Sequence, residues 1–219
     1  MQNLLPLLGI FAVFSPALLL PGPDFVAVVR NTVARGPRAG ILTALGVSLG
    51  ITAYAGLSAA GLSILFARLE WLEVIVRLAG AGFLSFLGIG LLRTPAPGFD
   101  QSTPEQTTER PGGRERNPVL LGLIVNLTNP KAIIFFASIF GTAIRPQTPP
   151  WVLTVAVTLV GVCGLVWFST VSLLTASTGM LVSLQRHQHW IERLAGLAFL
   201  GFALVMAIDL AIAAEARLR

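Results

Sequence analysis

Three long stretches of this chain contain no charged residue, and they limit what it can fold into. Residues 1–23, 39–67 and 146–185 hold no Asp, Glu, Lys or Arg. A helix needs about 20 predominantly apolar residues to cross the hydrocarbon core of a bilayer. Only 11% of the residues are charged and 54% are hydrophobic, whereas soluble domains carry about 25% charged residues. The chain is therefore predicted to be an all-α integral membrane protein.

The apolar segments predict six membrane spans in two groups of three. The spans cover residues 4–34, with a break inside, 39–67, 73–92, 118–143, 150–174 and 191–213. The hydrophilic segment at 94–117 is rich in Pro, Gly, Thr and charge and separates the two groups. The predicted organisation is a three-helix unit at 1–93, a cytoplasmic loop at 94–117 and a second three-helix unit at 118–219.

The two three-helix units have related sequences. Residues 76–93 read VRLAGAGFLSFLGIGLLR and residues 192–209 read ERLAGLAFLGFALVMAID, so that Arg77 aligns with Arg193. Chance similarity between apolar helices is the alternative, but a second correspondence argues against it, because the first span is interrupted at PGPD and the fourth at NPK. Three crossings invert the second unit relative to the first. The chain is therefore predicted to contain two inverted repeats, as many secondary transporters do.

The arginines predict the orientation of the chain in the membrane. With the N-terminus outside, nine arginines face the cytoplasm and five face the opposite side. The cytoplasmic group is Arg30, Arg35, Arg38, Arg93, Arg110, Arg114, Arg116, Arg186 and Arg193, and the other group is Arg68, Arg77, Arg145, Arg217 and Arg219. The positive-inside rule thus favours an N-out, C-out topology. Because these arginines are spread over short connections, the net charge of +5 does not indicate nucleic-acid binding.

The PGPD and NPK sequences each predict a helix that stops and restarts inside the membrane. Proline removes a backbone donor and clashes with the preceding turn, so no unbroken helix is expected through Pro21, Gly22 and Pro23. Unpaired backbone groups are costly in lipid, and a break is tolerated only beside protein or a wet cavity. Asp24 and Lys131 directly follow the two breaks. Both are expected near the midplane of the bilayer.

Two opposite charges at this depth are expected to form a site. A charged side chain at the bilayer centre costs about 2.5–3.5 kcal/mol on insertion scales, and pairing lowers that cost. Asp24 and Lys131 are therefore expected to approach each other across the repeat interface, directly or through water or substrate. A static ion pair that only fixes helix register is the alternative. A half-helix N-terminus with a lysine suits a carboxylate, and an aspartate suits an ammonium group, so the site is predicted to bind a zwitterion.

Two segments around the breaks carry a family resemblance. They are PGPDFVAVVRNTVARGPRAGILTALGVSLG at 21–50 and GLIVNLTNPKAIIFFASIF at 122–140, and together they resemble the signatures of the LysE/RhtB amino-acid exporter family. The resemblance covers nearly the whole chain. It implies a transporter, with no enzymatic activity and no cofactor, that exports amino acids across a bacterial inner membrane, is driven by protons and forms a homo-oligomer. The matching positions, taken as candidate substrate-binding residues, are Pro21, Gly22, Pro23, Asp24, Asn126, Asn129, Pro130 and Lys131.

Other residues are secondary candidates. Gly46 and Gly50 form a G-x-x-x-G sequence, which is explained more simply by close helix packing than by substrate contact. Tyr54 either presents its hydroxyl to a cavity or buries it with a satisfied hydrogen bond. His187 and His189 lack a nearby third ligand, so no metal site is predicted.

The predicted function is proton-driven export of a small or neutral amino acid or a related metabolite, with Asp24 the better candidate for proton coupling. The apolar side chains of Phe25, Phe135 and Phe136 near the breaks suit an uncharged substrate side chain. A non-transporting membrane scaffold or redox partner is the alternative, although Cys163 is the only thiol and cannot form a two-thiol relay. A metal-ion exporter ranks third, because Asp24 is the only clear hard ligand inside the membrane.

Overall fold

The computed structural model describes residues 5–93, 117–145, 148–175 and 180–218, and these ranges are all-helical. The predicted loop at 94–117 lies outside the described residues apart from Asn117, and the side chain of His187 is also outside them. Four helices are long and apolar enough to cross a membrane. They are α3 (Pro37–Arg68), α4 (Glu70–Arg93), α7 (Pro150–Thr175) and α8 (Met180–Leu218).

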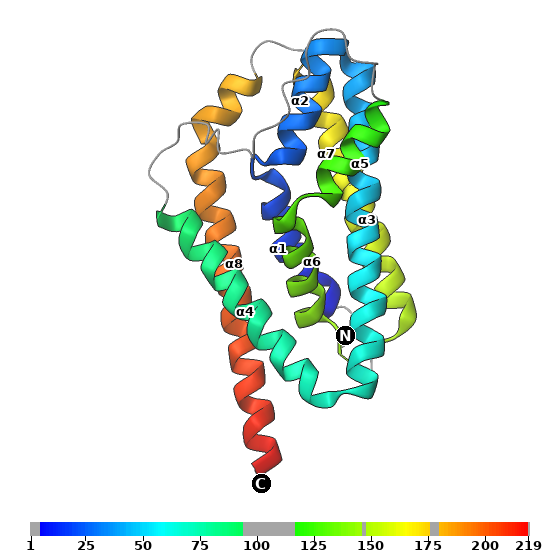
Figure 1. Cartoon of the computed structure of the whole chain (residues 1–219). Coiled ribbons are helices and arrows are strands. Elements are labelled where there is room, and N and C mark those ends of the chain that lie inside the picture. The colour runs from blue at the N-terminus through cyan, green and yellow to red at the C-terminus, as the bar shows by residue number, and fades with distance from the viewer. Residues whose placement is uncertain (1–4, 94–116, 146–147, 176–179, 219) are drawn as a thin grey trace.

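Two further spans are broken, at the positions that the sequence predicts. Helix α1 (Leu5–Leu19) meets α2 (Pro23–Arg35) at an angle of 46°, and α5 (Pro118–Leu127) meets α6 (Pro130–Ala143) at 66°. Counting each bent pair as one span gives six spans. The order of one broken and two straight spans occurs twice along the chain (Figure 1), as expected for two three-helix repeats.

Proline and capping residues explain where the second half of each broken span begins. Pro23 and Pro130 occupy the first turns of α2 and α6, where the missing N–H of proline costs nothing. Asn129 caps α6, and its side-chain oxygen accepts a hydrogen bond from the Lys131 backbone nitrogen at 3.1 Å. Each half-helix therefore starts at a defined residue inside the bundle.

The straight helices carry apolar side chains toward lipid as well as toward the core. Leu57, Phe86 and Leu204 have 62–71% of their surface exposed, whereas Val47, Leu84 and Phe199 are buried. A helix that is apolar on all sides is typical of a membrane span, because its outer face contacts acyl chains. The chain is a multi-pass membrane protein.

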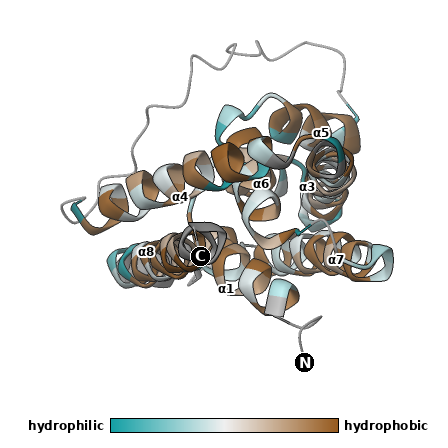
Figure 2. Ribbon diagram, turned by 90° about the horizontal axis from the view of Figure 1, so that it is seen from below, coloured by the Kyte–Doolittle hydropathy of each residue, from teal (hydrophilic) through white to brown (hydrophobic). Residues whose placement is uncertain are grey.

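The helices form two groups around the broken spans. Figure 2 shows α4 and α8 side by side on one side of the molecule and α3, α5 and α7 on the other, with α1 and α6 between them. We call the membrane face at which α2 ends and α3 begins the upper face, and the face at which α3 ends and α4 begins the lower face, as they lie in Figure 1. The predicted orientation makes the upper face cytoplasmic.

Candidate functional site

A cavity of about 270 Å³ lies where the two broken spans meet. Seven of the eight predicted substrate-binding residues line it, and only Pro130 does not. The first break contributes Pro21, Gly22, Pro23 and Asp24, and the second contributes Asn126, Asn129 and Lys131. The structure therefore brings together in space two sequence segments that the chain keeps about 100 residues apart.

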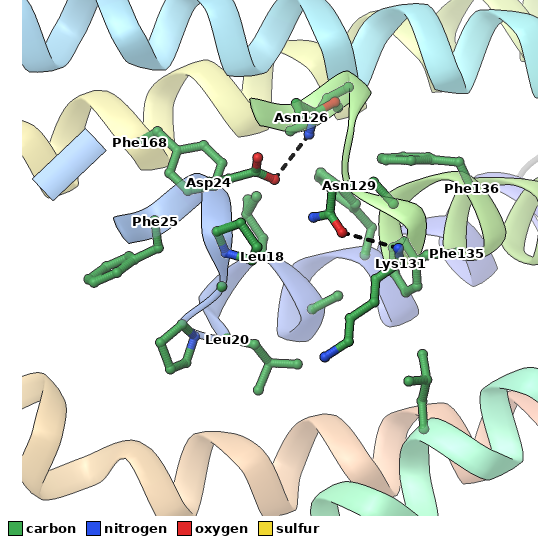
Figure 3. A pocket seen from close by; sticks show the side chains of 18 of the residues that line it. Leu18, Leu20, Asp24, Phe25, Asn126, Asn129, Lys131, Phe135, Phe136 and Phe168 are labelled. Atoms are coloured by element: carbon green, nitrogen blue, oxygen red, sulfur yellow. Dashed lines mark hydrogen bonds between the residues drawn. The ribbon is translucent and has the colours of Figure 1, made fainter. Parts of the chain in front are cut away.

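Asp24 forms its hydrogen bond with the other broken span. The Asn126 side-chain nitrogen donates to Asp24 Oδ2 at 3.0 Å (Figure 3), which links the start of α2 to the end of α5. Asp24 Oδ1 and Asn126 Oδ1 are both buried and have no hydrogen-bond partner among the described residues. Asn126 Oδ1 lies against Gly50 of α3. Because an unpaired buried acceptor costs about 1–3 kcal/mol, Asp24 Oδ1 favours a ligand that donates hydrogen bonds.

Lys131 and Asp24 do not form the direct ion pair that is one of the two predicted arrangements. Figure 3 shows the Lys131 side chain extending into the cavity, whereas the Asp24 carboxylate points toward Asn126. No carboxylate of the described residues lies within ion-pair distance of the Lys131 ammonium group. The Asp24 carboxylate instead accepts a hydrogen bond from Asn126. The Lys131 side chain is exposed to the cavity. The indirect arrangement, with water or substrate between the charges, stays a prediction.

The start of α6 makes one end of the cavity favourable for an anion. Amide groups of the first helical turn point out of the helix end, and the helix dipole adds partial positive charge there. The Lys131 ammonium group extends from this same turn. The cavity is therefore electrostatically divided, with acceptor oxygens on the Asp24 side and positive charge on the Lys131 side.

The remaining cavity wall is mostly apolar. The aromatic rings of Phe14, Phe135, Phe136 and Phe199 contact one another, with neighbouring ring centroids 5.7–6.0 Å apart. Further apolar lining comes from Leu18, Leu20, Phe25, Ile51, Leu87, Leu91 and Phe168. Such a wall suits the uncharged part of a small ligand, while a few polar groups fix its orientation.

Glu192 is a lining residue that the sequence interpretation did not single out. It comes from α8 and is only 8% exposed, although it stands near the beginning of the membrane-spanning part of that helix. In the alignment of the two repeats Glu192 occupies the position of Val76. Glu192 could have been identified from this alignment, because it is a carboxylate at a position where the other repeat has an apolar residue.

The three secondary candidates lie outside the cavity lining and contact residues of α5. A Cβ atom on Gly50 would stand 2.5 Å from Asn126 Oδ1, so the absence of a side chain makes room for Asn126. Tyr54 donates to the Leu127 carbonyl at 2.6 Å and satisfies a backbone acceptor at the end of α5. Gly46 packs against the backbone of α5 at Val119. These contacts agree with the simpler alternatives given for the three residues, which are helix packing for Gly46 and Gly50 and a satisfied hydroxyl for Tyr54.

Half-helices that end around a cavity with a few polar groups inside an apolar bundle are typical of membrane transporters. The comparison with known families agrees with this class. The chain matches the LysE type translocator family over residues 16–210, and it belongs to that family.

Named relatives cover most of the chain. It is 31% identical over 193 residues to the threonine efflux protein of Escherichia coli (strain K12), an alignment that covers 88% of this chain and 93% of that protein. The threonine efflux protein of Salmonella typhi is 32% identical over 196 residues with the same shares of coverage. An uncharacterized membrane protein of Haemophilus influenzae is 28% identical over 208 residues, 93% of this chain and 96% of the relative. No solved structure matches the chain.

Proposed function

We propose that this translocator exports a small or neutral amino acid, or a closely related metabolite, from a bacterial cytoplasm across the inner membrane. The observation that carries the proposal is the pair of opposite charges, Asp24 and Lys131, that enter one cavity from two separate helix breaks. Membrane proteins place ionisable residues at such depth where a substrate or ion passes.

The divided cavity suggests how an amino acid binds. Its ammonium group donates to Asp24 Oδ1, a buried acceptor without a partner among the described residues. Its carboxylate faces the Lys131 ammonium group and the first turn of α6. The substrate side chain then lies against the aromatic and aliphatic wall. In this arrangement the zwitterion replaces the direct ion pair that Asp24 and Lys131 do not make.

Threonine is the first substrate to test, because two relatives are named threonine efflux proteins. The cavity, of about 270 Å³, has room for an amino acid. We propose proton coupling through Asp24, the acidic residue that the ammonium group contacts. The N-out, C-out orientation and oligomer formation belong to the same proposal.

The direct test is exchange of labelled substrate in proteoliposomes that contain the purified protein. Vesicles loaded with unlabelled threonine should accumulate labelled threonine from outside, and a proton gradient should drive net movement. The double variant Asp24→Asn, Lys131→Met should lose exchange while it inserts normally. Equal exchange by the wild-type protein and this variant would contradict the proposed site. No exchange with any amino acid would favour the scaffold interpretation.

A further inference from the structure

The cavity extends from the helix breaks to α4 and α8. On α4 it is lined by Leu87 and Leu91, which lie close to the end of that helix at Arg93. On α8 it is lined by Glu192, close to His189, where the membrane-spanning part of α8 begins. In Figure 1 this end of α4 lies beside α8, near the level of the helix breaks. The cavity therefore lies between the two broken spans on one side and α4 and α8 on the other.

The bundle is filled between the cavity and the lower face. Ile139, Phe140 and Ile144, in the second half of α6 and directly after it, have no exposed surface. Helix α4 packs closely against this part of α6, because a Cβ atom on Gly80 would stand 2.8 Å from the Thr142 methyl carbon. Small residues at such a contact let two helices approach closely. The α4–α6 contact thus closes the path to the lower face.

A buried arginine, Arg77, connects α4 to the end of α6. Arg77 lies six residues inside the membrane-spanning part of α4, about 9 Å along the helix axis. It is 8% exposed, it donates to the Ile144 carbonyl at 3.3 Å, and its guanidinium lies 2.8 Å from the Glu73 carboxylate. Ile144 is the C-cap of α6, where a cation is favoured by the helix dipole. In the sequence analysis Arg77 served only to predict the orientation of the chain in the membrane. Its contacts show that it also connects α4 to the end of α6.

The equivalent residues of the second repeat have different surroundings. Arg193 aligns with Arg77, but it is exposed and lies 6.0 Å from the ring centre of Trp190. Gly196 aligns with Gly80, but it faces the Gly88 carbonyl of α4 instead of a broken span. Among the described residues, α8 makes no contact with α2 comparable to the contact of α4 with α6. Sequence positions that correspond in the two repeats thus form a close contact with a broken span in one case and form no such contact in the other.

We propose that Arg77 is a positioning residue that holds the lower face closed, and that Arg193 takes the corresponding place at the end of α2 when the upper face closes. This inference rests on the proposed transport function, because alternation between the two states would move a substrate across the membrane. In the structure described here α4 and α6 are in close contact, which is the state closed toward the lower face. Arg77 contacts no substrate, and it acts through the position of α6, the helix that carries Lys131.

The test measures access to the α4–α6 contact with a single reporter cysteine. Ser138 lies on α6 at this contact and is 5% exposed, so Ser138→Cys in a Cys163→Ser background places one shielded thiol there. A membrane-impermeant maleimide is applied to each face of oriented proteoliposomes. Arg77→Gln should raise the labelling rate from the lower face at least tenfold. Arg77→Lys, which keeps the positive charge, should restore most of the protection.

Three controls make the result specific. Arg145→Gln removes an exposed ion pair with Asp209 near the same face and should leave labelling unchanged. Arg193→Gln should also leave the lower face protected, and a rise equal to that of Arg77→Gln would mean general loosening and overturn the proposal. Unchanged labelling in Arg77→Gln would overturn it as well. If Arg77→Gln does not fold, as judged by gel filtration, Glu73→Gln replaces it with the same expected direction.

The two proposals fail in different ways. Labelling of the reporter cysteine requires no substrate, so it reports closure whether or not the protein moves threonine. Absence of exchange in the wild-type protein would refute the proposed transport function and leave the labelling result intact. Normal exchange together with unchanged labelling in Arg77→Gln would refute only the role of Arg77.

Discussion

Asn126 donates a hydrogen bond to Asp24 over 3.0 Å and so joins the ends of two broken spans that are 102 residues apart in the sequence. The contact leaves one oxygen of each side chain buried without a partner among the described residues. An ammonium group carries three donors and can serve the free oxygen of Asp24. The two residues are therefore the part of the cavity best suited to the amino end of a substrate.

Replacing Asp24 by asparagine should reduce threonine exchange about 10- to 100-fold. A hydrogen bond to a charged group is worth about 1.5–3 kcal/mol, and the variant removes the negative charge while it keeps the shape of the side chain. The measurement is the initial rate of exchange in proteoliposomes with equal amounts of protein. Asp209→Asn is the matched control, because Asp209 is an exposed carboxylate paired with Arg145, and it should change the rate less than about threefold. Equal losses in both variants would argue against a specific role for Asp24.

Replacing Lys131 by methionine should weaken recognition of the substrate carboxylate. Methionine keeps an unbranched stem of similar length and lacks the charge that extends into the cavity. The wild-type protein should prefer threonine over threonine amide as a competitor in the exchange assay by at least tenfold. Lys131→Met should reduce this preference to about twofold, because a lost charged hydrogen bond accounts for about 1.5–3 kcal/mol. A preference that survives the substitution would place the carboxylate elsewhere.

The spans and their breaks were predictable from the sequence, because they depend on local properties. Apolar length determines whether a helix can cross the bilayer, and Pro23 and Pro130 determine where a helix must restart. The directions of side chains were less accessible. Asp24 bonds to Asn126 and not to Lys131 because of the way in which the two broken spans cross. The crossing of two helices cannot be predicted from a local sequence pattern.

Charged residues near the ends of spans show the same limit. Arg77 and Glu192 stand within two turns of a span end, where a charged side chain ordinarily reaches the headgroups. Their burial comes instead from neighbouring helices, α6 for Arg77 and the helices around the cavity for Glu192. Sequence spacing alone does not distinguish the two situations. Only tertiary packing shows that Arg77 bonds to the end of α6 and that Glu192 lines the cavity.

Gly50→Ala should disturb the site although Gly50 does not line the cavity. A Cβ atom at this position would stand 2.5 Å from Asn126 Oδ1 and 2.9 Å from Asn126 Cβ, so Asn126 must leave the position from which it donates to Asp24. Overpacking of this kind costs about 1–3 kcal/mol. The single variant should lose both thermal stability and exchange activity. The double variant Gly50→Ala, Asn126→Gly removes all the clashing atoms and should regain part of the stability without activity, and recovery of both would show that Asn126 has no part in transport.

Two glycines of α3 offer a comparison between a helix crossing and an open surface. At Gly46 a Cβ atom would collide with the Val119 carbonyl and the backbone of α5, which cannot rotate away as a side chain can. At Gly61 no atom lies within 4 Å of the added carbon. Gly46→Ala should therefore lower the apparent melting temperature in detergent by about 5 °C or more, since overpacking costs about 1–3 kcal/mol. Gly61→Ala should leave it unchanged or raise it slightly, because alanine favours a helix more than glycine does. Because α5 carries Asn126, an equal tolerance of both substitutions would mean that the close contact of α3 and α5 does not determine the position of the second break.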